Sequence, residues 1–331
     1  MRSVAQPVRG DADPSLTWSV AIGVVMDGAL YADGICSGTL IAPDVVLTAA
    51  HCVSRMAPAQ DDCGARVAGA TSASSIVVSN AAIMPSALEA FPRKARKTMV
   101  PAGASKRLCG NDIALVFLDA PIGDVVPRSP RFSTQTAVGE SVTPVGYGQT
   151  CADDDASCVA TRGTRRKGNP RPIASVGAAG EDAEFSVAGP SVEAGDSGGS
   201  AMTEDLAYVV GVVSHKAGDD VFTDVSRFAE WMTSAVRDDA QERGAPTPAW
   251  ASPPPGDGGA PDGTAPDPVA AAAPRAEGAT TSSCAIAGPK APSPGASWLL
   301  GFVAALGVLL TRRRGRSLFS RAGRQSFRGG A

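Results

Sequence analysis

This sequence is poor in aromatic residues and in histidine. Aromatic side chains make up 5% of its 331 residues, and the two histidines are His51 and His215. A zinc site built from cysteine and histidine needs several of these residues near one another. Apart from the adjacent pair His51 and Cys52, no histidine stands near a cysteine in the sequence. The sequence therefore predicts no metal site, and nothing in it indicates a cofactor.

Apart from its C-terminal end, the chain as a whole has more acidic than basic residues. The formal net charge is −3, but the last twenty residues hold seven arginines and no acidic residue. Taking those seven from the 30 lysines and arginines leaves 23 basic against 33 acidic residues. An acidic body repels a polyanion, so we expect no nucleic acid as a partner. Two basic runs, Arg93 to Lys97 and Arg162 to Arg171, are predicted to be solvated loops.

The N-terminus lacks the apolar stretch of a signal peptide. No such stretch occurs from Met1 to Gly10. The seven cysteines nevertheless indicate an oxidising compartment and hence export. We expect either that the start of the chain is misassigned or that the precursor has been trimmed.

The region from about residue 18 to 223 has the pattern of an all-β protein. Short runs rich in Val, Ile and Leu alternate with turn-forming residues, which is typical of an antiparallel barrel or sandwich. The clearest strand candidates are Ser19–Met26, Ser37–Ile41, Val45–Thr48, Ile113–Leu118, Val142–Val145 and Tyr208–Ser214. A helix is predicted over Ser226–Arg237, with Ser226 as its N-cap and with its apolar residues, Phe228 and Trp231 among them, in the core.

Three short segments contain the residue types of nucleophilic catalysis. Taken singly, each has an ordinary structural explanation: a turn, a structural histidine, or an aspartate at the end of a strand. A serine hydroxyl becomes nucleophilic when a base lies within hydrogen-bond reach and a carboxylate fixes the tautomer of that base. The chain offers these groups in the order histidine, aspartate, serine, which is the order in chymotrypsin-type proteases. The residues are His51, Asp112 and Ser197, in the segments 48–52, 111–115 and 195–200.

With these motifs, the chain resembles the trypsin/chymotrypsin-like serine proteases from about residue 18 to 236. Further matches are the segments 36–41, 145–148 and 210–214. The resemblance implies two six-stranded antiparallel Greek-key barrels with the active site between them, followed by a C-terminal helix. It implies hydrolysis of protein or peptide substrates by Ser197, with His51 as base and Asp112 as its orienting carboxylate. We expect the protein to be a monomer.

The resemblance also assigns roles to residues around the triad. The backbone N–H groups of Gly195 and Ser197 would form the oxyanion hole. Ser214 would lie beside Asp112, on the strand that pairs with bound substrate. Asp196 would form an ion pair with the mature N-terminus, although the usual Ile-Val-Gly-Gly is only faintly echoed by residues 8–11.

Six of the seven cysteines fall into three pairs. Cys36 and Cys52 match the family disulfide next to the catalytic histidine. The other expected disulfides are Cys63–Cys109, which would tie together two catalytic loops, and Cys151–Cys158, which brackets a short acidic loop. Cys284 is left single.

The primary specificity pocket departs from the family pattern. Glu193 replaces a cysteine, so the disulfide that braces this pocket is missing, and the residue at the pocket base is Ser191. Lys216 and Asp220 stand where family members usually have glycine. Asp220 is expected to favour cleavage after basic residues, but two alternatives remain: Lys216 neutralises it, or it faces solvent, in which case Ser191 favours apolar side chains.

The C-terminal part has the composition of a tethered anchor. We divide the chain into an N-terminal segment (1–17), a protease domain (18–243), a disordered linker (244–296) that contains Cys284, and an apolar helix with an arginine-rich tail (297–331). The tail resembles myxobacterial surface-sorting tails, in which the cysteine retains the protein. The sequence thus predicts an exported serine endopeptidase, secreted or retained at the cell surface and membrane-associated through this tail. The alternative is a catalytically weak homologue that serves as a binding module.

Overall fold

The computed structural model of the chain describes residues 10–31, 34–57, 59, 63–151, 156–178 and 181–252. These residues belong to one compact unit within residues 1–260. Cys284, the predicted apolar helix and the linker beyond residue 252 lie outside the described residues. Among the described residues, no helix is long and apolar enough to cross a membrane.

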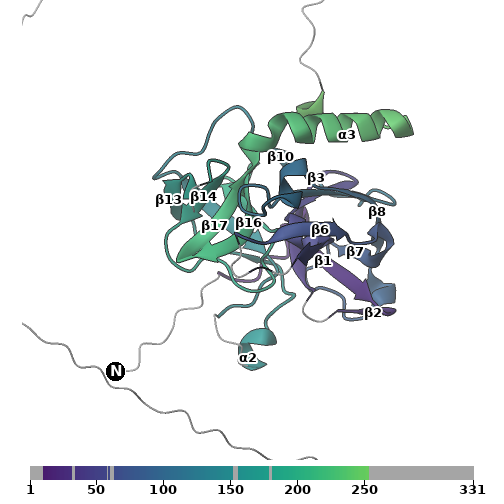
Figure 1. Ribbon diagram of the computed structural model, residues 1–331. Coiled ribbons are helices and arrows are strands. Elements are labelled where there is room, and N and C mark those ends of the chain that lie inside the picture. The colour runs from purple at the N-terminus through teal and green to yellow at the C-terminus, as the bar shows by residue number, and fades with distance from the viewer. Residues whose placement is uncertain are drawn as a thin grey trace, which may run out of the picture. The chain divides into compact units, whose positions relative to one another are not determined.

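Six antiparallel strands close into a first barrel, drawn in purple to blue in Figure 1. Their order around the barrel is β1-β3-β4-β9-β8-β7, and β7 pairs back with β1. The bounds are β1 (Ser19–Met26), β3 (Cys36–Ala42), β4 (Val45–Thr48), β7 (Ile76–Ser79), β8 (Arg93–Met99) and β9 (Ala114–Leu118). Smaller elements at the barrel's ends are β2 (Ala29–Leu30), α1 (Ala50–Val53), β5 (Ser54–Ala57) and β6 (Arg66–Ala70), with 3-10 turns η1 (Ala73–Ser75), η2 (Leu88–Ala90) and η3 (Ala102–Ser105).

A second barrel, teal to green in Figure 1, repeats this arrangement. Its order is β11-β13-β14-β17-β16-β15, and β15 pairs back with β11. The bounds are β11 (Ser141–Gly146), β13 (Arg171–Val176), β14 (Glu184–Val187), β15 (Ser200–Thr203), β16 (Tyr208–Ala217) and β17 (Asp219–Asp224). The short strands β10 (Ser129–Pro130) and β12 (Arg166–Lys167) and the helix α2 (Ala156–Val159) lie at its periphery. When the six strands of each barrel are numbered in chain order, their order around the barrel is 1-2-3-6-5-4 in both barrels. The predicted pair of six-stranded barrels is confirmed.

The C-terminal helix packs on the first barrel. It consists of a 3-10 turn, η5 (Val225–Phe228), and α3 (Ala229–Arg243). Met232 and Val236 are fully buried in the core of that barrel. The predicted cap was wrong, because the turn begins one residue earlier than expected: the Asp224 carboxylate accepts the N–H of Ser226 at 2.9 Å.

The first basic run is a barrel strand, so the prediction of a solvated loop was wrong. On β8, the Arg96 guanidinium donates to both carboxylate oxygens of Asp239 on α3, at 2.7 and 2.5 Å. Arg96 and Lys97 also lie over the ring of Phe117, at 5.4 and 5.3 Å from its centroid. The basic side chains therefore attach the C-terminal helix to the barrel.

The second basic run contains the largest fully buried side chain of the described residues, Arg165. Its guanidinium donates to the backbone carbonyls of Asp13, Pro14, Ser19 and Asn80. A guanidinium presents five donors in a fixed fork, so it satisfies several carbonyls at once. Arg165 thus holds the residues before β1 against the second barrel.

The chain still packs on the first barrel beyond residue 244, where the linker was predicted to start. Trp250 lies in the 3-10 turn η6 (Ala249–Ala251). Its indole N–H donates to the carbonyl of Ile41 at 2.7 Å, and its ring meets the ring of Phe132 edge-on. Ala251 is fully buried. The residues up to Ala251 therefore belong to the packed region.

Candidate active site

Strand pairing brings His51 and Asp112 together. The end of β4 pairs with the start of β9, with Thr48 opposite Ala114. The residues that follow β4 and those that precede β9 must therefore lie at the same end of the barrel. His51 follows β4 on α1, and Asp112 precedes β9.

The contact between these two side chains is direct. The Nδ1 atom of His51 lies 2.7 Å from Oδ2 of Asp112, and the backbone N–H of His51 donates to Oδ1 at 3.0 Å. The Ser214 hydroxyl, on β16 of the second barrel, donates to Oδ2 at 2.7 Å. Full burial alone raises the pKa of Asp112, but the charge and N–H groups of His51 and the Ser214 hydroxyl outweigh it, so the pKa falls below its usual value. Asp112 is therefore a buried carboxylate held in its ionised form.

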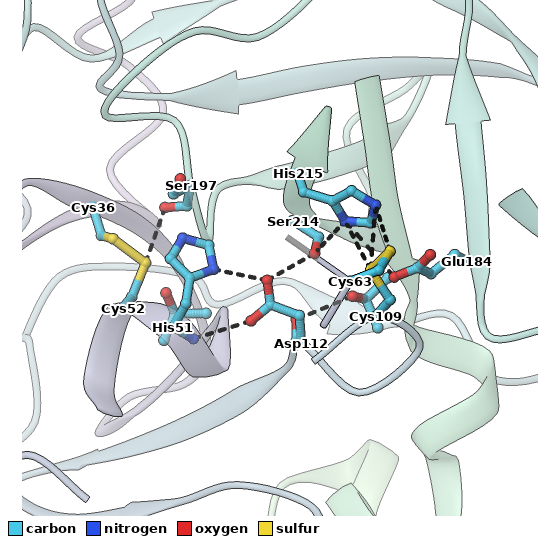
Figure 2. Close-up of polar contacts among 12 residues, drawn as sticks. Cys36, His51, Cys52, Cys63, Cys109, Asp112, Glu184, Ser197, Ser214 and His215 are labelled. Carbon is cyan, nitrogen blue, oxygen red and sulfur yellow. Dashed lines mark hydrogen bonds and ion pairs between the residues drawn. A yellow bond between two sulfur atoms is a disulfide. The ribbon is translucent and has the colours of Figure 1, made fainter. Parts of the chain in front are cut away.

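Ser197 comes from the second barrel, in the loop between β14 and β15. Figure 2 shows it beside the imidazole ring of His51, and both residues line a hollow of about 430 Å³. Ser37 on β3 fixes this loop: its N–H donates to the Ser197 carbonyl and its hydroxyl to the Gly195 carbonyl, both at 2.8 Å. The three predicted triad residues are thus placed together between the barrels.

The glycines on either side of Ser197 have steric reasons. Gly195 has a φ of +96°, a conformation that side-chain-bearing residues rarely adopt. At Gly198, a Cβ atom would lie 2.1 Å from Oγ1 of Thr48 and 2.5 Å from the carbonyl oxygen of Ser37, so any side chain would push the two barrels apart. The loop therefore approaches the first barrel as closely as its backbone permits.

Asp196 is completely buried beneath the loop. Its carboxylate accepts the N–H groups of Gly148 and Glu193, the latter at 2.9 Å. The predicted partner, the mature N-terminus, involves residues before Gly10, which lie outside the described residues. The ion pair of Asp196 with the N-terminus stays a prediction.

The three expected disulfides are present. They are Cys36–Cys52, Cys63–Cys109 and Cys151–Cys158. Cys36 and Cys52 line the same hollow as His51. Cys109 is three residues from Asp112, so its disulfide anchors the loop that carries the carboxylate.

A second hollow, of about 190 Å³, is also lined by Ser197, and with it by Ser214 and Lys216, which were predicted to belong to the primary pocket. Asp220, paired with Lys216 across β16 and β17, is only 2% exposed, so the alternative in which this residue faces solvent was wrong. Its Oδ2 accepts the N–H and the hydroxyl of Ser191, the latter at 2.8 Å, and the N–H of Val192 at 3.0 Å. The ammonium of Lys216 lies 3.7 Å from Oδ1 of Asp220 and 2.9 Å from Oε1 of Glu193. Lys216 is thus placed to neutralise the pocket's carboxylates.

Sequence reasoning missed two buried groups behind the triad, Glu184 and His215. Glu184 is fully buried and accepts the N–H of Gly110, and within the described part of the chain its Oε2 has no hydrogen-bond partner. Burial raises the pKa of Glu184 to about 7. Nδ1 of His215 lies 3.1 Å from the Ser214 hydroxyl and 3.9 Å from Oε1 of Glu184 (Figure 2). The position of His215 directly after Ser214 was the one available signal; Glu184 had none.

Comparison with known proteins agrees with this geometry. The family model described as Trypsin matches residues 9–232. Among solved structures, the chain is similar to the scabies mite inactivated protease paralogue S-I1, with 19% identity and a TM-score of 0.51, over 70% of this chain and 99% of that one. No curated protein matches the sequence. By its fold and by the family match over residues 9–232, the chain belongs to the trypsin family.

Proposed function

We propose that this protein is a serine endopeptidase in which Ser197 is the nucleophile, His51 the general base and Asp112 the orienting carboxylate. One observation carries the proposal: the buried Asp112 carboxylate holds His51 through two contacts, at 2.7 and 3.0 Å, with Ser197 beside the ring. A structural role alone does not require a buried carboxylate aimed at a partly exposed imidazole.

In the proposed reaction, Oγ of Ser197 attacks the carbonyl carbon of the scissile bond and its proton passes to Nε2 of His51. The oxyanion is held by the N–H groups of Gly195 and Ser197. His51 then gives the proton to the leaving amine, and an acyl-enzyme remains on Ser197. Water then attacks the carbonyl carbon of the acyl-enzyme while its proton passes to His51. His51 returns the proton to Oγ of Ser197, and the carboxylic acid product is released.

Covalent labelling tests the proposal without knowledge of the substrate. The wild-type protein should react with a fluorophosphonate, and Ser197→Ala should not. Peptide hydrolysis by Ser197→Ala should fall by roughly 10⁶-fold, as in other triads that lose the nucleophile. Ser200→Ala is the control, because Ser200 is a nearby buried serine whose hydroxyl has no hydrogen-bond partner among the described residues. Equal labelling of Ser197→Ala and the wild type would refute the role of Ser197.

One observation favours the second candidate, a binding module with weak catalysis. The ammonium of Lys216 lies across the primary pocket, between two carboxylates. If the wild-type protein is folded but neither labels nor hydrolyses any peptide of a library, the binding module is the better description.

We also propose that the protein is exported and retained at the cell surface through Cys284 and the tail. The three disulfides support export. A chain that ends at Ser252 should be released from cells as a soluble, folded protein, and its retention in the cell fraction would contradict the proposal.

A further inference from the structure

The primary pocket contains a positive charge of its own. The hollow beside Ser197 is lined by Val192, Glu193, Ala194, Val213, His215 and Lys216, along with Ser214. Lys216 supplies the charge, and its side chain is 47% exposed. Lys216 stands opposite Asp220 in the pairing of β16 with β17, so the sheet itself directs the two side chains towards one another.

Asp220, the partner of Lys216, is itself held by internal hydrogen bonds. All three donors on Oδ2 of Asp220 come from Ser191 and Val192. The Ser191 hydroxyl is used in this bond as a donor. Oδ1 is therefore the oxygen of Asp220 that is left for a cation, and it faces the ammonium of Lys216.

Lys216 also connects the two walls of the pocket. Its ammonium bonds Glu193, on the loop before the nucleophile, while its backbone belongs to β16. Glu193 and Asp220 are nearly buried, with side chains 7% and 3% exposed. Two buried carboxylates need a cation, and Lys216 provides one in every molecule, before any substrate arrives.

We propose that Lys216 is a built-in occupant of the primary pocket, which excludes arginine and lysine side chains of the substrate and selects small uncharged ones. This inference rests on the peptidase function proposed above. A basic substrate side chain would have to displace Lys216 from both carboxylates and would gain the same interactions that it breaks. A small uncharged side chain fits beside Val192 and Val213 without disturbing the ion pairs.

Binding of p-aminobenzamidine, a small aromatic cation with a fluorescent signal, tests the pocket without any chemistry. The wild-type protein should bind it weakly, and Lys216→Met should bind it about tenfold or more tightly, because two buried carboxylates are left without a cation. Lys216→Arg keeps the charge and should bind as weakly as the wild type. Lys97→Met is the matched control, since the Lys97 ammonium also lies near two carboxylates, at 3.8 and 3.7 Å, but on β8.

Kinetics on matched peptides with Ala, Val, Phe, Lys or Arg before the scissile bond complete the test. The wild-type protein should prefer Ala and Val, and Lys216→Met should shift towards Arg and Lys by about tenfold or more in kcat/KM ratio. The inference would be overturned if the wild-type protein bound p-aminobenzamidine tightly or cleaved efficiently after arginine. Either result counts even if Lys216→Met fails to fold. A protein that binds benzamidine as expected but cleaves no peptide would overturn the peptidase proposal instead and leave the pocket's occupant established.

Discussion

Replacement of Glu184 by glutamine should change how the stability of the protein depends on pH. The wild-type carboxyl is fully buried, and burial raises its pKa from 4.5 to about 7. In the unfolded chain the carboxyl ionises near its ordinary value. Between these two values the folded state binds more protons than the unfolded state, so the free energy of unfolding falls as pH rises.

The size of the effect follows from the two pKa values. One pKa unit corresponds to about 1.4 kcal/mol, so the interval between 4.5 and about 7 corresponds to at most about 3.5 kcal/mol. Below pH 4.5 the carboxyl is neutral in both states and the penalty vanishes; above pH 7 the penalty is complete. Glutamine carries no charge, and Glu184→Gln should therefore gain stability relative to the wild type across this window. An unpaired amide group at the place of Oε2 would add a constant offset without changing the slope.

The measurement is urea unfolding of both proteins from pH 4 to 8. The difference in free energy of unfolding, variant minus wild type, should rise by about 1–3 kcal/mol up to pH 7 and then level off. Glu242→Gln is the control, because Glu242 is 69% exposed, and its curve should run parallel to that of the wild type. Parallel curves for Glu184→Gln would refute a raised pKa at this position.

Two further substitutions test the supports of the site. Arg165→Met should lower the free energy of unfolding by about 3 kcal/mol or more in urea unfolding, because four carbonyls in one buried and three partly buried hydrogen bonds each lose a donor. A loss below about 1 kcal/mol would mean that water replaces the guanidinium. Ser214→Ala should reduce kcat by about 10- to 100-fold, because Asp112 loses the 2.7 Å hydrogen bond from the Ser214 hydroxyl. The acid limb of the pH–rate profile should be displaced as well. An unchanged kcat would show that His51 alone holds the carboxylate.

Much of the fold was predictable because strands with strong apolar patterns dominate it. All six predicted strand segments coincide with observed strands, from β1 (Ser19–Met26) to β16 (Tyr208–Ala217). The basic strand β8 was missed because its arginine and lysine side chains are neutralised by Asp239, which is far away in the sequence. Local composition carries no information about such a partner.

The site was predictable in its residues but not in its electrostatics. The motifs predicted His51, Asp112 and Ser197 as one group. In the structure, Asp112 contacts His51, and His51 and Ser197 line the same hollow. The contact of Asp220 with a cation depends on Lys216, which also pairs with Glu193. The side chains of Lys216 and Glu193 meet only when the loop that contains Glu193 packs against β16. The buried Glu184 has no motif, because its environment is created by strands distant in sequence.

The contacts of Ser37 have a consequence for the integrity of the molecule. Its N–H and hydroxyl hold the Ser197 and Gly195 carbonyls, and its hydroxyl also accepts the N–H of Tyr147, so one residue of the first barrel sets the place of the nucleophile loop in the second. Neither half of the chain contains a complete reaction centre. A cut in the connection between β9 and β11 would leave the six strands of each barrel on one fragment, with α3 of the second fragment still packed on the first barrel, and would be silent while the fragments stay docked. Turnover would then report the association of the two halves, not the folding of either.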